Sequence, residues 1–376
     1  MTQNHSSHGR RAACLVIAAV VSVLLASCAG AVSGGELDLA RLKLTAEQER
    51  ELERMHEAAI KSGETDISLY AGHHDEYTAI YKDFEKRFPG LTISPETYAG
   101  AELQTALESE RTSGRRVADV ISNPNADRYA QQGFAQPYRV VTFTMPEWAN
   151  GRISKDQLAA PDHTYYSPWS LMFCTSYNTK RMTEAELPKS WDALAGPEWS
   201  GKLTFMDPSV PGGTMTVLTV LLNAGVVDHR WLEAVGKNTK IVAQDQLALQ
   251  SVSSGEFPFQ PLSATTSIVH AQRDGAPVSA HFFPENNVIA TEKWMLAAGA
   301  PSSDAAKVLL NYLHTVDAQR MALESGNFPT NQDKSLSSPH GWPSLAQANF
   351  VPLPAQALLR KKMDEFGPIF KRVTAG

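Results

Sequence analysis

Short apolar segments alternate with amphipathic segments along most of this chain, and this alternation limits the possible fold more than any other feature. Residues 66–72 form a short apolar run, residues 76–88 place their apolar side chains at helical spacing, and residues 91–94 are apolar again. Pro89 and Gly90 end the amphipathic segment. A strand, a helix and a second strand in this order predict a βαβ unit with parallel strands. The expected fold class is therefore α/β.

The same alternation continues toward the C-terminus. Strands are expected at residues 117–122, 170–175, 259–262 and 278–283, and helices at residues 44–62, 101–111, 215–223, 304–313, 318–325 and 355–366. The helix at 44–62 has a local start signal, because Thr45 and Gln48 have the spacing of a capping box. A length of 376 residues suggests two domains.

The charge composition argues against a nucleic-acid partner. Only 20% of the residues are charged, and the formal net charge is −6. Proteins that bind nucleic acid neutralise phosphates with a basic patch, and no long Lys/Arg run is present beyond the extreme N-terminus.

The N-terminal segment has the pattern of an export signal. Arg10 and Arg11 precede an apolar run at residues 12–26, which is short for a membrane span and typical of a signal-peptide core. The run ends in Leu-Ala-Ser-Cys, which resembles a bacterial lipobox with Cys28 as the lipidated residue. We expect a lipoprotein signal peptide at residues 1–27 and a tether at 28–36; the alternative is an ordinary secretory signal. The protein would then face the periplasm or cell exterior, held at the membrane by its lipid alone.

Several segments in order resemble the extracellular solute-binding proteins of ABC importers, in particular the group of ferric-iron-binding proteins. The matching stretches cover residues 69–73 (Leu-Tyr-Ala-Gly-His), 84–90, 117–121, 132–138, 187–203, 254–257 and 275–278. The resemblance implies a two-lobed type II periplasmic-binding-protein fold with discontinuous lobes and a central cleft. It also implies a monomeric protein that captures a small-molecule ligand and delivers it to an ABC permease and its ATPase.

The resemblance also sets the expected lobe boundaries. Lobe 1 should comprise residues 37–166 plus 284–340, and lobe 2 residues 167–283. The chain should cross between the lobes near Trp169 and return near Pro284. Residues 341–376 should form a C-terminal helical extension, which the sequence does not assign to either lobe.

The iron ligands of the resembling group are mostly missing from this chain. That group holds iron with a His after the first strand, a Glu after the third and an adjacent Tyr pair in the second lobe. The His position is filled by His73 or His74, and the Glu position falls near Asn123-Pro124-Asn125. The Tyr pair would fall within residues 263–267, where this chain has Ala264-Thr265-Thr266-Ser267. Neutral hydroxyl groups do not replace phenolates on ferric iron. Tyr165 and Tyr166 form another adjacent pair, but it precedes the crossover and is interpreted as hinge packing.

The residues that remain favour a small organic anion, such as a phosphonate, a phosphate ester or a carboxylate. A Gly-Gly-Thr sequence at a helix start offers unhindered backbone N–H groups to an anion. Binding of ferric iron or of a polyamine by the same fold is the alternative. A polyamine would need acidic and aromatic side chains, which Trp169 and Glu285 near the crossovers could supply. The candidate ligand-binding residues are His73, His74, Asn123, Asn125, Trp169, Gly212, Gly213, Thr214, Thr265, Thr266, Ser267 and Glu285.

A secreted hydrolase is the competing interpretation from another functional class. The chain contains no Gly-x-Ser-x-Gly, His-Glu-x-x-His or Gly-x-x-x-x-Gly-Lys-Ser/Thr sequence. We therefore expect a binding protein rather than an enzyme, with no cofactor and no required transition metal.

Overall fold

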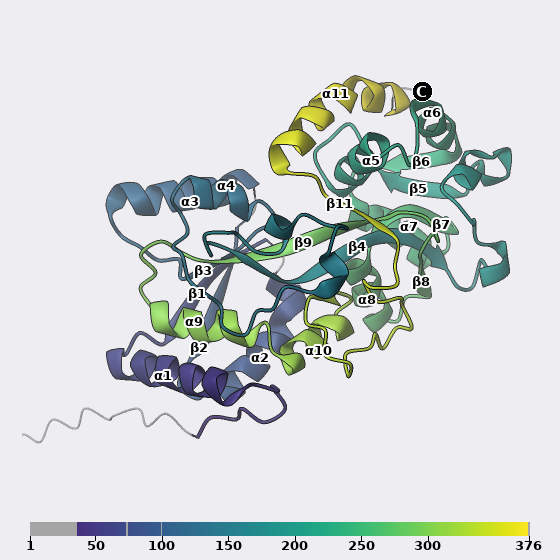
Figure 1. Cartoon of the computed structure of the whole chain (residues 1–376). Helices are drawn as coiled ribbons and strands as arrows, with labels where there is room; N and C mark the ends of the chain where they lie inside the picture. Colours follow the sequence, from purple (N-terminus) through teal and green to yellow (C-terminus); the bar gives the residue numbers. More distant parts are fainter. Residues whose placement is uncertain (1–35, 73, 99, 375–376) are drawn as a thin grey trace, which may run out of the picture. The chain divides into compact units, whose positions relative to one another are not determined.

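Two long antiparallel strands pass through the middle of a single large sheet. The computed structural model describes residues 36–72, 74–98 and 100–374. In it, β4 (Tyr166–Asn178) pairs with β9 (Asn287–Leu296), with Tyr166 opposite Trp294 at one end and Phe173 opposite Val288 at the other. The strands of one lobe join the sheet beside β9 at one end of this pair, and those of the other lobe join it beside β4 at the opposite end. β4 and β9 therefore belong to both lobes (Figure 1).

The first lobe is built on β1 and its parallel neighbours. β1 pairs with β2 and β3 in parallel, as the βαβ pattern predicts, and β3 pairs antiparallel with β9. The strand predicted at 117–122 is shorter than expected, because the backbone N–H groups of Val117 and Ala118 donate to the Glu110 carboxylate instead of to a strand. The elements of this lobe and of the segment that leads into β4 are α1 (Ala46–Ser62), β1 (Asp66–Ala71), η1 (His74–Tyr77), α2 (Thr78–Arg87), β2 (Thr92–Thr97), α3 (Gly100–Ser113), β3 (Val120–Ser122), α4 (Ala126–Gln131), η2 (Glu147–Ala149), η3 (Lys155–Gln157), α9 (Ser303–Tyr312) and α10 (Val316–Glu324).

The second lobe contains its own parallel strands. β5 pairs in parallel with β6 and β7, and β7 pairs antiparallel with β4. The elements of this lobe are η4 (Glu184–Glu186), η5 (Asp192–Ala195), η6 (Pro197–Trp199), β5 (Leu203–Met206), α5 (Gly213–Asn223), α6 (His229–Asn238), β6 (Thr239–Val242), α7 (Asp245–Ser254), β7 (Phe259–Ala264), α8 (Thr265–Arg273), β8 (Val278–His281), β11 (Phe350–Pro352) and α11 (Gln356–Thr374). The short β10 (Phe328–Pro329) pairs with β4 at Trp169 and Ser170.

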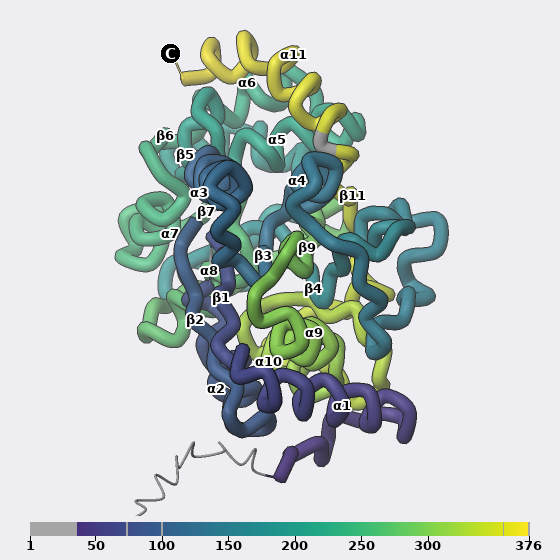
Figure 2. The backbone as a smooth tube through the Cα atoms, turned by 90° about the vertical axis from the view of Figure 1, so that its left-hand side faces the viewer, coloured from purple at the N-terminus to yellow at the C-terminus, as the bar shows by residue number. Residues whose placement is uncertain are grey.

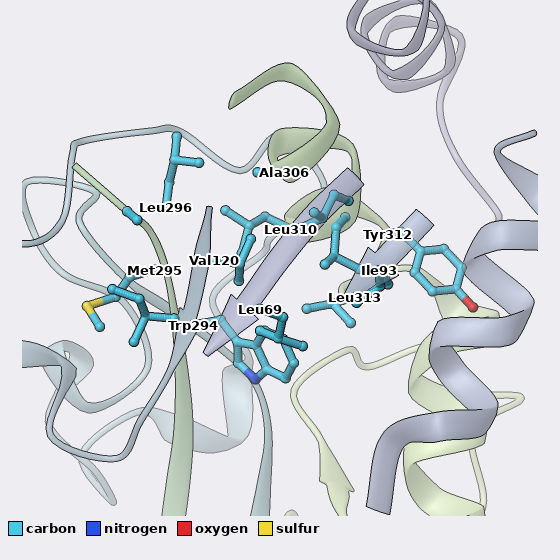
Figure 3. Close-up of a cluster of buried hydrophobic side chains, with 14 of the residues drawn as sticks. Leu69, Ile93, Val120, Trp294, Met295, Leu296, Ala306, Leu310, Tyr312 and Leu313 are labelled. Carbon is cyan, nitrogen blue, oxygen red and sulfur yellow. The ribbon is translucent and has the colours of Figure 1, made fainter. Parts of the chain in front are cut away.

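The two largest hydrophobic cores correspond to the two lobes. The first includes Leu69, Val120 and Trp294 from the sheet together with Leu310 and other residues of α9, which Figure 3 shows packed against one another. The second core contains side chains of β5, α5, α6 and β7, and Val288 and Ala290 contribute to it from the near end of β9. Each crossover strand therefore has one end in each core.

The two helices at the ends of the described chain pack on different lobes. α1 begins with the predicted capping box, in which the N–H of Thr45 donates to Gln48 at 2.9 Å, and it packs against α9. α11 lies against α5 and α6 (Figure 2). Its apolar face, which includes Phe366 and Phe370, belongs to the core of that lobe. The C-terminal extension therefore supports the second lobe, which the sequence had left open.

Two predictions about export concern residues that the structure does not describe. The signal peptide, Cys28 and most of the tether lie outside the described residues. Within the described ranges, no helix has the length and apolar character needed to span a bilayer. Cys174, interpreted from sequence as a buried strand thiol, is fully buried in β4, and burial raises its pKa.

Candidate functional site

Three helices of the second lobe begin at the same edge of the sheet. The parallel strands β7, β5 and β6 are neighbours in that order, and they lead into α8, α5 and α7. In open α/β sheets, ligands bind outside the carboxyl ends of the strands, where such helices begin. Two groups of predicted ligand residues lie at this edge: Gly212, Gly213 and Thr214 at α5, and Thr265, Thr266 and Ser267 at α8.

The start of α5 already holds a carboxylate from this chain. Thr214 is buried, and its hydroxyl donates to Oδ1 of Asp245 at 2.8 Å. The backbone N–H groups of Gly213 and Thr214 lie close to the same carboxylate and lower its pKa. Burial raises the pKa of Asp245, and these hydrogen bonds oppose the shift by stabilising the charged form. Asp245 was not predicted from the sequence.

The start of α8 has no carboxylate from its own segment. Its N-cap residue, Ala264, makes no side-chain cap, and no acidic residue occupies the first turn. Thr265 and Thr266 are buried; the hydroxyl of Thr265 accepts a hydrogen bond from the N–H of Met172 at 3.2 Å. The hydroxyl of Thr266 lies close to the carboxylate of Glu76 in the first lobe and lowers its pKa. This contact joins the two lobes at the edge where the candidate residues lie.

The loop after β1 supplies part of the first-lobe half of the candidate site. His73 lies outside the described residues. His74 is directed to its own lobe: its Nε2 is 2.8 Å from the Thr97 hydroxyl and its Nδ1 is 3.1 Å from Asp75. Burial raises the pKa of Glu76, and the hydrogen bond from Thr266 and the nearby His270 oppose that shift. Among the described residues of this loop, Glu76 is thus the one that lies next to side chains of the second lobe.

The loop after β3 lies next to that after β1, because β1 and β3 are parallel neighbours. Asn123 is nearly buried, and its side-chain oxygen accepts the N–H of Asn125 at 2.8 Å. The ammonium group of Lys293 in β9 donates to the carbonyl of Pro124 at 2.9 Å. Burial lowers the pKa of Lys293. The loop with both predicted Asn residues is thus fixed to a crossover strand.

Two other predicted ligand residues do not join these groups. Trp169 is completely buried, with its ring centroid 5.0 Å from that of Tyr77 and 5.8 Å from that of Trp294, so it packs the crossover. Glu285 is exposed in the connection between β8 and β9. Tyr165 and Tyr166 are buried in the first core, in agreement with the hinge-packing interpretation.

Glu292 is a further acidic residue near the first-lobe loops, and sequence reasoning did not single it out. Its carboxylate accepts a hydrogen bond from Ser122, at the end of β3, at 2.6 Å. Burial raises the pKa values of Tyr77 and Tyr81, and the negative charge of Glu292 adds to both shifts. The signal that could have identified Glu292 is a charged residue inside an otherwise apolar strand.

The described side chains do not assemble a metal-ligand cluster. Among residues 36–72, 74–98 and 100–374, no group of three or more His, Cys, Asp or Glu side chains is positioned to hold a metal ion.

Comparison with known proteins places this architecture in a family. The profile of a family described as bacterial extracellular solute-binding protein matches residues 79–346. The major ferric iron-binding protein of Neisseria gonorrhoeae is 24% identical over 197 residues, which cover 51% of this chain and 57% of that protein. The chain thus spans little more than half the length of this relative.

Solved structures share the fold. Iron-bound HitA from Pseudomonas aeruginosa matches with a TM-score of 0.64 at 18% identity, covering 82% of this chain and 99% of that one. AfuA from Actinobacillus pleuropneumoniae, solved with exogenous fructose-6-phosphate bound, matches with a TM-score of 0.61 at 14% identity, covering 82% and 99%. These likenesses confirm the predicted two-lobed type II periplasmic-binding-protein fold. With its two cores joined by crossover strands and a family match over most of its length, the chain belongs to the bacterial extracellular solute-binding proteins.

Proposed function

We propose that this protein is the substrate-binding component of an ABC importer, which captures a solute between its lobes and delivers it to a membrane permease driven by an ATPase. Family membership supports this role. So does the architecture, because two lobes joined by the crossover strands β4 and β9 can close around a ligand by hinge motion. We propose that residues 37–166 plus 284–340 move as one lobe and 167–283 as the other, with residues 341–376 following the second.

The ligand that we propose is a small organic anion, and the start of α8 is the observation that carries this proposal. Its first turn presents backbone N–H groups at the positive end of the helix dipole, with no acidic residue of its own to neutralise them. Thr265, Thr266 and Ser267 add hydroxyl groups. The contact of Thr266 with the Glu76 carboxylate supports the idea that this position receives an anionic oxygen. Because Glu76 comes from the other lobe, a ligand can replace it when the lobes separate.

A cationic ligand is the second candidate. Related proteins include a ferric iron-binding protein and an iron-bound structure. In this chain the carboxylates of Glu76 and Glu292 both act on the buried Tyr77. These charges would attract a metal ion or a polyamine.

We also propose that residues 1–27 are a lipoprotein signal peptide and that Cys28 carries the lipid anchor, with the lobes outside the membrane. The Leu-Ala-Ser-Cys sequence at residues 25–28 supports this assignment. The extracellular placement of the family agrees with export.

A thermal-shift screen of the purified protein tests the proposed function. A ligand that binds the native state raises the melting temperature by mass action. The panel contains carboxylates, phosphonates, phosphate esters, polyamines and ferric salts. Saturable binding of an anion that is recovered unchanged supports the proposal and separates it from a hydrolase. A strong shift with ferric iron or a polyamine, and none with any anion, overturns the anion assignment but retains the importer role.

A further inference from the structure

Asp245 occupies a position where the second lobe would otherwise present free hydrogen-bond donors. It is the first residue of α7, and β6, the strand before it, is a parallel neighbour of β5, the strand before α5. Its Oδ1 accepts the Thr214 hydroxyl at 2.8 Å. A Cβ atom placed on Gly213 would lie 2.9 Å from Oδ2, closer than side-chain atoms normally approach. The glycine therefore allows the carboxylate to reach the first turn of α5.

This carboxylate takes the place that an oxyanion would occupy at α5. Gly212, the N-cap residue of that helix, supplies no side-chain cap. The Asp245 carboxylate lies against the first turn instead, where the Thr214 hydroxyl donates to it. Both partners belong to the second lobe, and the contact therefore persists whether the lobes are open or closed. The start of α8 differs, because the carboxylate close to it, that of Glu76, comes from the first lobe.

We propose that Asp245 is a selectivity residue of this binding protein, which excludes phosphoryl and phosphonyl groups and restricts the solute to carboxylates bound at the start of α8. The inference rests on the proposed function, in which the ligand is an organic anion. A phosphonate or phosphate ester carries up to two negative charges and three oxygens, so it needs more donors and meets stronger repulsion from a fixed carboxylate. A carboxylate has one charge and two oxygens, which the first turn and hydroxyls of α8 can accept.

The test compares two probes with the same alkyl chain, propionate and ethylphosphonate, on the intact mature protein. Their dissociation constants are measured by calorimetric or NMR titration for the wild type and for Asp245→Asn. The wild type should favour propionate, and the substitution should improve ethylphosphonate binding at least tenfold while changing propionate binding much less. Asp245→Ser provides a second variant, and melting curves verify that both variants fold.

Asp207→Asn is the matched control. Asp207 follows β5 at the same edge and accepts the N–H of Ser209 at 2.7 Å, so the change removes the same charge without freeing the start of α5. No gain for ethylphosphonate is expected from it. An equal gain in Asp207→Asn, no gain in either Asp245 variant, or tight ethylphosphonate binding by the wild type overturns the inference. Failure of the proposed function has a different signature, because the wild type then binds no anion in the full panel.

Discussion

The guanidinium group of Arg87 lies 2.7 Å from the carboxylate of Asp317, and both side chains are almost completely buried. The pair joins the end of α2 to the first turn of α10. Arg87 also donates to Asp83 and to two backbone carbonyl groups, so its charge is surrounded by acceptors. The first lobe is thus held together by a buried ion pair as well as by its apolar core.

Replacing Asp317 with Ala should destabilise the protein by about 3 kcal/mol, because removing one partner of a buried pair leaves the other charge poorly compensated. Urea unfolding of the purified protein measures this loss. Asp333→Ala is the control, since Asp333 pairs with the half-exposed Lys43, and exposed pairs contribute at most about 1 kcal/mol. Equal losses for the two variants would contradict the assigned role of the Arg87–Asp317 pair.

His314 should make the first lobe sensitive to acid. Its ring packs against Phe143 and Tyr166, and burial lowers its pKa from 6.5 to about 3. The unfolded chain takes up this proton near pH 6.5, whereas the native protein does not until about pH 3. Stability therefore falls as the pH is lowered between these values, with a slope of up to about 1.4 kcal/mol per pH unit from this group.

The comparison of His314→Leu with the wild type isolates that contribution. The wild type should lose stability relative to the variant at each step below pH 6.5. Burial raises the pKa of Asp119 to about 6, so this group stabilises the native protein as the pH is lowered. Its effect opposes that of His314, but it is the same in the wild type and in the variant. His270→Leu, at an exposed position, serves as the control. Parallel stability curves for the wild type and His314→Leu would show that the buried imidazole does not control acid sensitivity.

Thr266→Val should weaken binding of the captured anion about tenfold. The substitution retains the shape of a buried side chain and removes one hydrogen bond to a charged group, which contributes on the order of 1.5–3 kcal/mol. Titration with the best ligand from the thermal-shift panel measures the effect. Thr204→Val is the control variant, because it makes the same change at a buried position within β5 instead of at the start of α8. An affinity unchanged by Thr266→Val would remove the start of α8 from the binding site.

Cys28→Ser should release the protein from the cell membrane into a soluble fraction. The lipobox-like sequence at residues 25–28 is the reason, since a Ser in place of the Cys cannot carry the thioether-linked lipid. Fractionation and intact-mass analysis of the N-terminal residue measure the outcome. The anchor assignment is wrong if the variant stays membrane-bound and the wild type carries no acyl mass.

Local sequence signals were sufficient for much of the fold. The capping box at Thr45 and Gln48 and the periodicity of the next helix act over a few residues, so they can be read without knowing what lies nearby. The parallel order of β1 and β2 follows from their short crossover. The same reasoning places polar residues after the carboxyl ends of strands, and it correctly put residues 212–214 at a helix start, whereas residues 265–267 were expected in a loop and form the first turn of α8.

Only the tertiary structure decided how those residues are used. Asp245 reaches Thr214 across 31 residues, and Glu292 reaches Ser122 across 170. Such contacts depend on which strands are neighbours in the sheet, and no local pattern encodes that order. The register of β4 against β9 likewise places Trp169 inside the crossover, where it packs against other rings rather than facing a ligand. The sequence therefore determined which elements form and which loops are polar, whereas strand order and register determined which of those polar groups are already satisfied by the protein itself.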